Sequence, residues 1–297
     1  MTKVVALGGG HGLAASLQAI RRYADDVCAI VSVADDGGSS GRLRAAFGIA
    51  PPGDLRRCLV ALADTGSMWS EAFEHRFDAG ELEGHAFGNL VIAGLAATTG
   101  DFELALNEAG RLLGAVGRVI PATSQPVVLR AVVRPAAANG SVPAADMADV
   151  EGQVAVANCG RIARVSLVPP DAKPPAAALE AIATADQIVL GPGSLFTSVL
   201  AVGAVPALRD ALAAAAGQKV YVCNLGAQHP ETAGYDVAAH VDALRVHGIG
   251  VDVVLYHPGA LPLGRLDVRG VGRSVARPDG LAHDPAKLAL ALADLVG

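Results

Sequence analysis

The sequence of 297 residues lacks the features that mark zinc-binding, membrane-spanning and nucleic-acid-binding proteins. Its cysteines, Cys28, Cys58, Cys159 and Cys223, are too dispersed for a zinc site, and we expect reduced, mostly buried thiols. No apolar run reaches the ~18 residues of a membrane span, and the N-terminus has no signal-peptide pattern. Dense basic stretches are absent and the formal net charge is −6. We therefore expect a cytoplasmic protein with no membrane span whose main partner is not a nucleic acid.

Common catalytic and metal-binding patterns are absent as well. The sequence has no G-x-S-x-G nucleophile elbow and no Walker loop ending in GK(S/T), which excludes a P-loop ATPase. His229, Glu231, His240 and His247 do not have the spacing of metal ligands on a helix. His240 and His247 share one helical face, which we expect to face solvent.

Hydrophobic residues, at 52% of the chain, are sufficient for a sizeable core. Buried-strand patterns alternate with helical patterns, which predicts an α/β fold with a mostly parallel sheet covered by helices on both faces. We predict strands at 3–7, 28–34, 187–190, 219–224 and 252–256, and helices at 12–23, 54–65, 88–97, 103–113, 175–184, 206–215, 234–247 and 285–296.

The segment 118–170 has a different pattern. Its β-branched runs at 127–133, 154–157 and 162–167 are short and are separated by Gly, Pro and Asn, which is typical of small antiparallel strands. We expect this segment to be a β-rich insertion within a single domain that spans 1–297.

A glycine turn, Gly8-Gly9-Gly10-His11-Gly12, connects the first predicted strand to the first helix. Glycines let backbone N–H groups approach a ligand closely, and the helix N-terminus adds positive partial charge, so the turn is a candidate phosphate cradle. Together with Asp35 at the end of the second strand, the turn fits a dinucleotide-binding fingerprint and an NAD(P)-dependent oxidoreductase. The alternative interpretation is a tight turn without a ligand.

The second glycine-rich loop, Asp35-Asp36-Gly37-Gly38-Ser39-Ser40-Gly41-Arg42, is richer in polar groups than a ribose site needs. Its carboxylates, hydroxyls and Arg42 suit Mg²⁺, a sugar or a phosphate, although a solvated turn that caps its own backbone would look the same. On an extended backbone Asp35 and Asp36 point in opposite directions, so we expect only one of them to reach a given ligand atom.

Three further segments complete the candidate site. Gly53 and Asp54 begin a helix that carries Arg56 and Arg57, of which we expect only one to face the site. His85 and Asn89 flank a helix start and both can donate a hydrogen bond. The loop 191–198 (GPGSLFTS) follows a strand and is a second candidate anion nest. Two such loops at one sheet edge suit a diphosphate.

These motifs resemble the YvcK branch of the CofD-like family, the gluconeogenesis factors. The resemblance rests on GGGHGL at 8–13, VADDGGSSGRLR at 33–44, PPGDLR at 51–56, GHAFGNL at 84–90 and GPGSLFTS at 191–198. It continues through Cys223-Asn224-Leu225 and Glu231-Thr232, in order over nearly the full length.

The resemblance implies a cytoplasmic bacterial protein with a modified Rossmann-like fold. It implies binding of a nucleotide diphosphate, notably a UDP-sugar such as UDP-N-acetylglucosamine, in support of cell-wall (peptidoglycan) synthesis and cell shape during gluconeogenic growth. The sister branch transfers a phospholactyl group to a deazaflavin with Mg²⁺, which makes a phospholactate transferase of the CofD type the alternative. A homo-oligomer is compatible with the Ala-rich helices.

The motifs and the resemblance together give a set of candidate ligand-binding residues, with Asp35 or Asp36 as the Mg²⁺ ligand if the metal accompanies the diphosphate. The set is Gly9, Gly10, His11, Gly12, Asp35, Asp36, Gly38, Ser39, Arg42, Gly53, Asp54, Asn89, Gly191, Gly193, Ser194, Phe196, Thr197 and Asn224. The sequence departs from the family pattern in four places: His11 replaces a usual Thr, Arg57 a usual Asn and Phe196 a usual Tyr, and 227–230 (AQHP) stands where Met-Thr-Gln-Pro-Gly is common.

Overall fold

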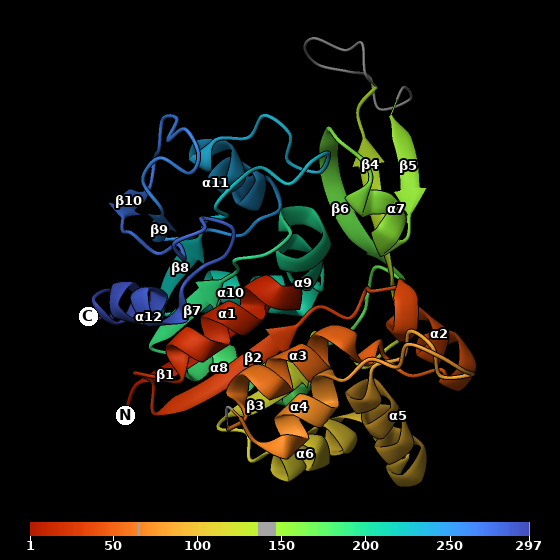
Figure 1. Cartoon of the computed structure of the whole chain (residues 1–297). Helices are drawn as coiled ribbons and strands as arrows, with labels where there is room; N and C mark the ends of the chain where they lie inside the picture. The colour runs from red at the N-terminus through yellow and green to blue at the C-terminus, as the bar shows by residue number, and fades with distance from the viewer. Residues whose placement is uncertain (65, 136–146, 297) are drawn as a thin grey trace.

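The computed structural model describes residues 1–64, 66–135 and 147–296 (Figure 1). Its largest element is a parallel sheet of seven strands in the order β10-β9-β8-β7-β1-β2-β3. The strands are β1 (Lys3–Gly8), β2 (Asp26–Val31), β3 (Arg118–Pro121), β7 (Gln187–Leu190), β8 (Gln218–Val222), β9 (Val253–Tyr256) and β10 (Arg269–Gly272).

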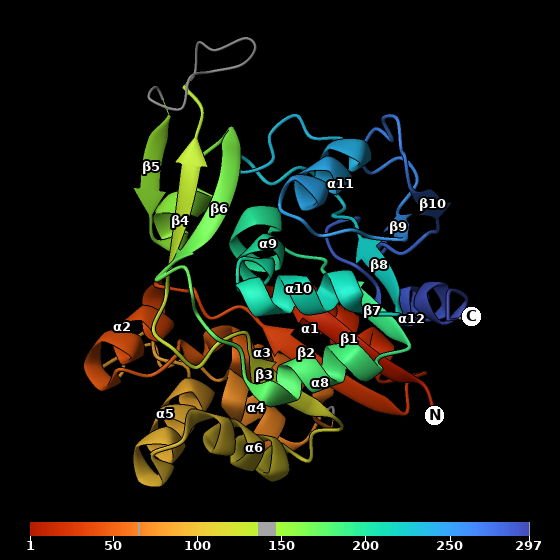
Figure 2. The ribbon, with the colours of Figure 1, turned by 180° about the vertical axis from the view of Figure 1, so that it is seen from behind.

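Helices cover both faces of this sheet, which confirms the predicted α/β class. One face carries α1 (Gly10–Ile20), α3 (Pro52–Leu62) and α12 (Pro285–Ala293), and the other carries α8 (Ala176–Thr184) and α10 (Pro206–Ala214) (Figures 1 and 2). The remaining helices are α2 (Gly38–Phe47), α4 (Met68–Glu74), α5 (Phe87–Thr99), α6 (Phe102–Leu113), the π-helical turn η2 (Leu195–Val199), α9 (Leu200–Gly203) and α11 (Val237–Val246).

The strand order reverses next to β1, which fixes the place of a ligand. β1 pairs with β2 on one side and with β7 on the other, so Val5 lies between Cys28 and Ile188. The chain leaves β1 toward β3 on one side and returns toward β10 on the other. Open parallel sheets bind ligands at such a switch point, beyond the carboxyl ends of the strands. The loops after β1, β2 and β7 all end there.

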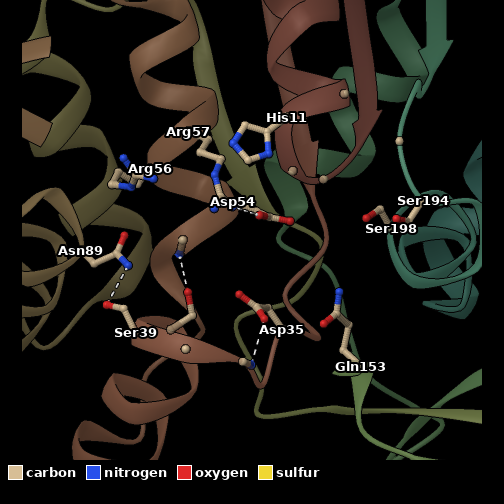
Figure 3. Close-up of a pocket in the computed structure, with 18 of the residues that line it drawn as sticks. His11, Asp35, Ser39, Asp54, Arg56, Arg57, Asn89, Gln153, Ser194 and Ser198 are labelled. Atoms are coloured by element: carbon tan, nitrogen blue, oxygen red, sulfur yellow. Dashed lines mark hydrogen bonds and ion pairs between the residues drawn. The ribbon is translucent and has the colours of Figure 1, made fainter. Parts of the chain in front are cut away.

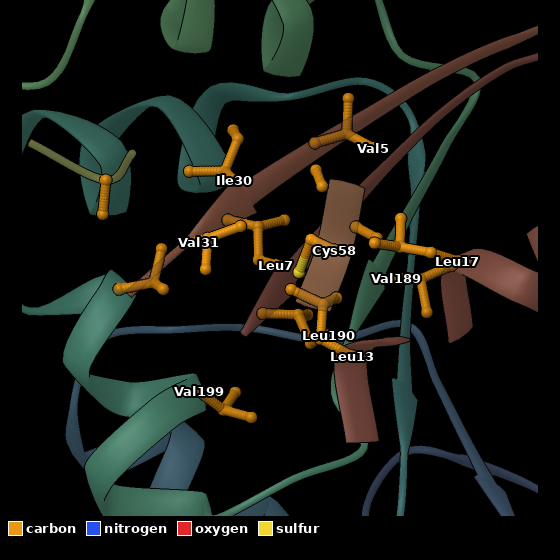
Figure 4. Close-up of a cluster of buried hydrophobic side chains, with 14 of the residues drawn as sticks. Val5, Leu7, Leu13, Leu17, Ile30, Val31, Cys58, Val189, Leu190 and Val199 are labelled. Atoms are coloured by element: carbon orange, nitrogen blue, oxygen red, sulfur yellow. The ribbon is translucent and has the colours of Figure 1, made fainter. Parts of the chain in front are cut away.

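The core lies between these three strands and the helices that cover them. Figure 4 shows Leu7, Ile30 and Val189 of the sheet with Leu17 of α1 and Cys58 of α3, all fully buried. Strands buried on both faces read as continuous apolar runs, which is why the sequence pattern identified them.

A second, antiparallel sheet stands apart from the first in the order β5-β4-β6 (Figure 1). Its elements are β4 (Val128–Val133), β5 (Ala148–Glu151), the short helix α7 (Gln153–Ala157) and β6 (Ile162–Val168). The predicted β-rich insertion is therefore present, although residues 118–121 belong to the main sheet and part of the predicted segment lies outside the described residues. The predicted strand at 154–157 is wrong, because Asp36 caps the start of a helix there.

Two other expectations need correction. Residues 38–47 form the helix α2 where the glycines and serines suggested a loop. His240 and His247 are buried, not solvent-facing, because α11 turns that face toward the core. Within the described residues no single helix is long and apolar enough to span a bilayer; Leu195–Gly203 and Pro206–Ala214 would reach that length and composition only as a pair, and they are bent by 78°.

Candidate ligand-binding site

The loops after β1, β2 and β7 surround a cavity of about 450 Å³ at the switch point (Figure 3). The starts of α3 and α5 and the start of α7 complete its walls. Its lining consists mainly of glycines, hydroxyls, carboxylates and guanidinium groups. The cavity is therefore suited to a polar, charged ligand rather than to an apolar one.

Two glycines of the turn after β1 lie in close contact with neighbouring segments. A Cβ on Gly9 would lie 2.6 Å from Asp54 Oδ2 and 3.3 Å from Ser198 Oγ. A Cβ on Gly12 would lie 2.4 Å from the carbonyl oxygen of Pro192. The turn is thus in direct contact with the loop after β7, and the backbone of that loop leaves space only for glycine at position 12.

Side-chain amides hold the loop after β7 in place. The Gly193 N–H donates to Asn224 Oδ1 over 3.1 Å, and Asn224 Nδ2 donates back to the Gly193 carbonyl over 2.9 Å. Asn224 Nδ2 also contacts Gln228 Oε1, and Gln228 Nε2 donates to Ser194 Oγ over 3.1 Å. This network presents Ser194 at the cavity wall and explains why Asn224 supports the loop without lining the cavity itself.

The backbone N–H groups at the start of η2, which were predicted to bind an anion, donate to a carboxylate of the protein itself. Glu231 Oε1 accepts the backbone N–H groups of Phe196 over 2.7 Å and Thr197 over 3.2 Å. Burial raises the pKa of Glu231, while these hydrogen bonds lower it. The interpretation of Phe196 and Thr197 as ligand-binding residues is therefore corrected: both are buried, neither lines the cavity, and their amides are used internally.

An ion pair of α3 lies next to the glycine turn. Arg57 Nη1 and Asp54 Oδ1 form an ion pair of 2.7 Å. The pKa of Asp54 is raised, first by burial and also by the charge of the nearby Asp35. The charge of Arg57 and a hydrogen bond from the Gly10 backbone partly offset this by lowering it. The pKa of His11 is lowered, first by burial and then by Arg57, so its imidazole is neutral at neutral pH and offers one donor and one acceptor.

Both arginines of α3 line the cavity, against the expectation that only one would. The reason is that the first turns of α3 border the cavity, and adjacent positions diverge by ~100° to different parts of it. Arg57 points to Asp54, whereas the buried Arg56 donates to the Phe73 carbonyl over 3.0 Å and pairs with Glu74 at 2.8 Å. Arg76, from the segment between α4 and α5, adds a further guanidinium.

The wall opposite the β7 loop is built from α2 and α5. Ser39 Oγ lies 3.0 Å from His85 Nδ1 and accepts Asn89 Nδ2 over 3.1 Å. Asn89 Oδ1 is buried and, in the part of the chain that is described, has no hydrogen-bond partner. Ser40 Oγ accepts the Gly53 N–H over 3.1 Å and ties α2 to α3. An unpaired buried acceptor beside a polar cavity is a candidate ligand contact.

Of the two adjacent aspartates only Asp35 lines the cavity. Its Oδ1 accepts the Gly37 N–H over 3.0 Å. Asp36 points the other way, and its two carboxylate oxygens each accept one backbone N–H, from Gln153 and from Val154, at 3.0 Å. Asp36 therefore caps α7 and does not line the cavity, which corrects its place among the candidates.

Most of the predicted residues do border the cavity. They are Gly9, Gly10, His11, Gly12, Asp35, Gly38, Ser39, Gly53, Asp54, Asn89, Gly193 and Ser194. Those that do not line it are Asp36, Arg42, Gly191, Phe196, Thr197 and Asn224; Arg42 donates to the Glu83 carbonyl instead. Residues outside the candidate set that also line it are Gly37, Ser40, Arg56, Arg57, Arg76, Gln153, Ser198 and Gln228. Ser40, Arg56, Arg57 and Ser198 lay within the motifs, whereas Arg76 and Gln153 carried no sequence signal.

A second hollow of about 400 Å³ adjoins the first. The two share His11, Gly12, Gly193 and Gln228. The rest of its lining comes from Ala15, Pro192, the loop Asn224–Ala227 and the turn Gly280–His283, and it is more apolar than the main cavity. A long ligand can therefore extend from one hollow into the other across the glycine turn.

Comparison with known proteins identifies the family. The family model of the 2-phospho-L-lactate transferase CofD matches residues 4–270. The chain therefore belongs to the CofD family. A crystal structure of a UPF0052 family member from Bacillus halodurans superimposes with a TM-score of 0.89 at 36% identity, covering 98% of each chain, and has the same α/β fold.

Relatives in this family carry the name gluconeogenesis factor. The protein of that name from Halalkalibacterium halodurans is 42% identical over 86% of this chain and 77% of its own length. The Bacillus subtilis gluconeogenesis factor is 40% identical over 88% of this chain and 80% of its own length. These matches confirm the resemblance to the YvcK branch that the motifs indicated.

The departures from the family pattern differ in their consequences. Phe196 is buried against Tyr235 and His247, with ring centroids 6.2 Å and 6.0 Å apart, so its lack of a phenolic oxygen does not affect the cavity wall. His11 and Arg57 both line the cavity. Of the departures, these two therefore change the chemistry of the cavity wall.

The residues of the cavity fit a magnesium ion only in company with a phosphate. Among the described residues no three His, Cys, Asp or Glu side chains form a group that can hold a metal. Asp35 and Asp54 line the same cavity, and the charge of Asp35 raises the pKa of Asp54. Mg²⁺ is commonly held by one or two carboxylates plus substrate phosphates. These two carboxylates match that donor set, and Asp36 does not.

Proposed function

We propose that this protein binds a nucleotide-diphosphate sugar of the UDP-sugar class, such as UDP-N-acetylglucosamine, across the two hollows. In this proposal it acts as a binding and regulatory protein, without turnover, that supports cell-wall synthesis and cell shape during gluconeogenic growth. The names of its relatives, gluconeogenesis factors, favour the link to gluconeogenic growth. The chemistry of the site favours the ligand class.

The observation that carries the proposal is the connection of the hollows through four shared residues. His11, Gly12, Gly193 and Gln228 lie where the glycine turn and the β7 loop meet, and backbone N–H groups at a helix start favour phosphate. Arg57 adds positive charge on the same side of the cavity. A diphosphate at this junction would direct its two substituents into the two hollows.

The second hollow suits a nucleobase. Its lining combines the apolar Ala15 and Pro192 with the loop 224–227, which brings backbone polar groups to the same hollow. Leu281, at the rim, is 86% exposed and would be covered by a planar ring. The main cavity, lined by Ser39, Asn89 and other polar groups, then receives the sugar.

Magnesium, when bound with the diphosphate, would be held by Asp35 and Asp54 and would neutralise part of the phosphate charge. The residues of the chain have their own parts in this arrangement. Arg57 offsets the charge of Asp54 and of the ligand, and the neutral His11 donates or accepts one hydrogen bond at the junction.

Isothermal titration calorimetry tests the proposal. We expect saturable binding of UDP-N-acetylglucosamine, weaker binding of UDP, and no binding of N-acetylglucosamine alone, each with and without Mg²⁺. Absence of heat with UDP-sugars at millimolar concentration, in protein shown to be folded, would reject the ligand class.

Replacing Ser194 by Ala tests the phosphate side of the junction. The hydroxyl accepts from Gln228 and lies at the cavity wall, so its loss should weaken UDP-sugar binding by ~1 kcal/mol, the scale of one hydrogen bond. The matched control is Ser124→Ala, which removes an exposed hydroxyl that donates to Glu103 and lines neither hollow, and it should leave binding unchanged. Equal affinity of wild type and Ser194→Ala would remove Ser194 from the site.

A phospholactate transferase of the CofD type is the second candidate. The family model and the paired Asp35 and Asp54 favour it. Incubation with a deazaflavin acceptor, a phospholactyl nucleotide donor and Mg²⁺ distinguishes the two candidates. Product that depends on Asp35 would favour the transferase, and no product at high protein concentration would exclude it.

A further inference from the structure

The β-rich insertion reaches the main cavity through one side chain. Among the described residues of 128–168, Gln153 alone lines that cavity. It is the first residue of α7, and its side chain is directed toward the cavity (Figure 3). No partner for its carboxamide is present in the described part of the chain, so the group is free to bind a ligand.

Asp36 determines where Gln153 lies. Its carboxylate accepts the N–H groups of Gln153 and Val154, which are the first two of α7. A Cβ on Gly152 would lie 2.5 Å from Asp36 Oδ2, and Gly152 has φ +98°, so only glycine allows this approach. α7 also packs against β4 and η2, which fixes it between the insertion and the β7 loop.

The chemistry of a carboxamide indicates the part of the ligand that it contacts. It is uncharged and offers both donor and acceptor atoms, which matches hydroxyl and acetamido groups, whereas phosphates are better held by guanidinium groups. The guanidinium groups of this cavity come from α3 and from the segment between α4 and α5, not from the insertion.

We infer that Gln153 is a specificity-determining residue that recognises the uncharged sugar of the ligand, and that Asp36 is its positioning residue. The inference rests on the proposed function, because it needs a nucleotide-diphosphate sugar in the cavity. It assigns the adjacent aspartates to separate tasks: Asp35 faces the ligand and Asp36 holds the insertion.

Calorimetry with UDP-N-acetylglucosamine and with UDP tests the first part. We expect Gln153→Ala to lower the affinity for the UDP-sugar about fivefold, the scale of one neutral hydrogen bond, and to leave the affinity for UDP within about twofold. Asp36→Asn replaces one carboxylate oxygen by an amide that cannot accept, and should have the same selective effect. The double variant should lose no more than either single one, because both act through one contact.

Hydrogen exchange tests the positioning role separately. The amides of Gln153 and Val154 should exchange faster in Asp36→Asn and be unchanged in Gln153→Ala. Asp101→Asn is the matched control, since Asp101 also accepts two backbone N–H groups but at the start of α6, and it should change neither exchange of α7 nor binding.

The outcomes separate this inference from the proposed function. Wild-type protein that binds neither UDP nor the UDP-sugar would overturn both, and the wild-type titration alone shows it. If the wild type binds the UDP-sugar, only the inference is at stake in the Gln153→Ala titrations. It would be overturned if this variant lost affinity equally for UDP and the UDP-sugar, or lost none. Unchanged exchange of α7 in Asp36→Asn would overturn the role of Asp36.

Discussion

Buried histidines lie close to the site on the side of β8 and α11. Burial is the main cause that lowers the pKa of His240, His247 and His283, that of His283 to about 4. His240 Nε2 and His283 Nε2 are buried and have no hydrogen-bond partner in the described chain. These side chains are therefore held neutral, and their protonation opposes the folded state.

His283 should make the protein sensitive to acid. Its pKa in the folded protein, about 4, is below the ordinary 6.5, so the unfolded chain binds more protons between these values and stability falls as the pH drops through that window. From pH 7 to pH 5 the unfolding free energy of the wild type should fall by about 2 kcal/mol more than that of His283→Gln. Urea unfolding at the two pH values measures this difference.

The control for this prediction is His229→Gln, because His229 is exposed. It should follow wild type at both pH values. A His283→Gln variant with the same pH dependence as wild type would show that burial of this ring is not a source of the acid sensitivity.

At the scale of elements, the site depends on two loops in direct backbone contact. Gly12 of α1 lies against the Pro192 carbonyl, and Glu231, more than thirty residues later in the chain, accepts the amides of Phe196 and Thr197 in η2. The first contact requires a glycine, and the second replaces an external anion by an internal one. Both fix the geometry of the loops before any ligand arrives.

Gly12→Ala should force the two loops apart. The added Cβ would lie 2.4 Å from a backbone oxygen, which cannot move as a flexible side chain does, so we expect a loss of about 1–3 kcal/mol of stability and of UDP-sugar binding. Thermal unfolding and calorimetry measure the two effects.

Gly94→Ala is the matched control within α5. In the described structure its Cβ would meet no atom within 4 Å, so the substitution should stabilise by roughly 0.5–1 kcal/mol through helix propensity. A Gly12→Ala variant as stable as wild type would contradict the close approach of the two loops.

Elements that depend on local pattern could be predicted from the sequence, and contacts between distant segments could not. Val4–Leu7 and Ile188–Leu190 are continuous apolar runs, and both are central strands. Val154 lies in a β-branched run but is helical, because Asp36 caps it from more than a hundred positions away. The same holds for Thr197, whose amide had the local setting of a nest but is bound by Glu231.

At the scale of the whole molecule, two of the contacts that hold the antiparallel sheet against the rest of the fold are made by Asp36 and His247. Asp36 caps α7, and the buried His247, directly after α11, accepts the Val165 N–H of β6 over 3.0 Å. His247 Nδ1 lies 2.7 Å from the Ala243 carbonyl, so the ring donates there and accepts at Nε2. Neutral His247 is required for this attachment, and burial favours that form.

His247→Ala should loosen the insertion. It leaves the buried Val165 N–H without an acceptor, a loss of about 1–3 kcal/mol, and it removes the ring that packs on Phe196. We expect faster cleavage within the insertion in limited proteolysis at neutral pH. Val246→Ala, at an exposed neighbouring position, should cleave at the wild-type rate; equal rates for both variants would contradict the attachment.

The four residues that belong to both hollows impose a condition on what the protein can detect. His11, Gly12, Gly193 and Gln228 form a single crossing point, so a free nucleotide and a free sugar phosphate would compete for it instead of binding side by side. Only the covalently joined molecule fills both sides at once, and joining adds the two contributions without a second loss of translational freedom. Under the proposed function, the protein would therefore respond more strongly to the amount of the conjugate in the cell than to the supply of either half.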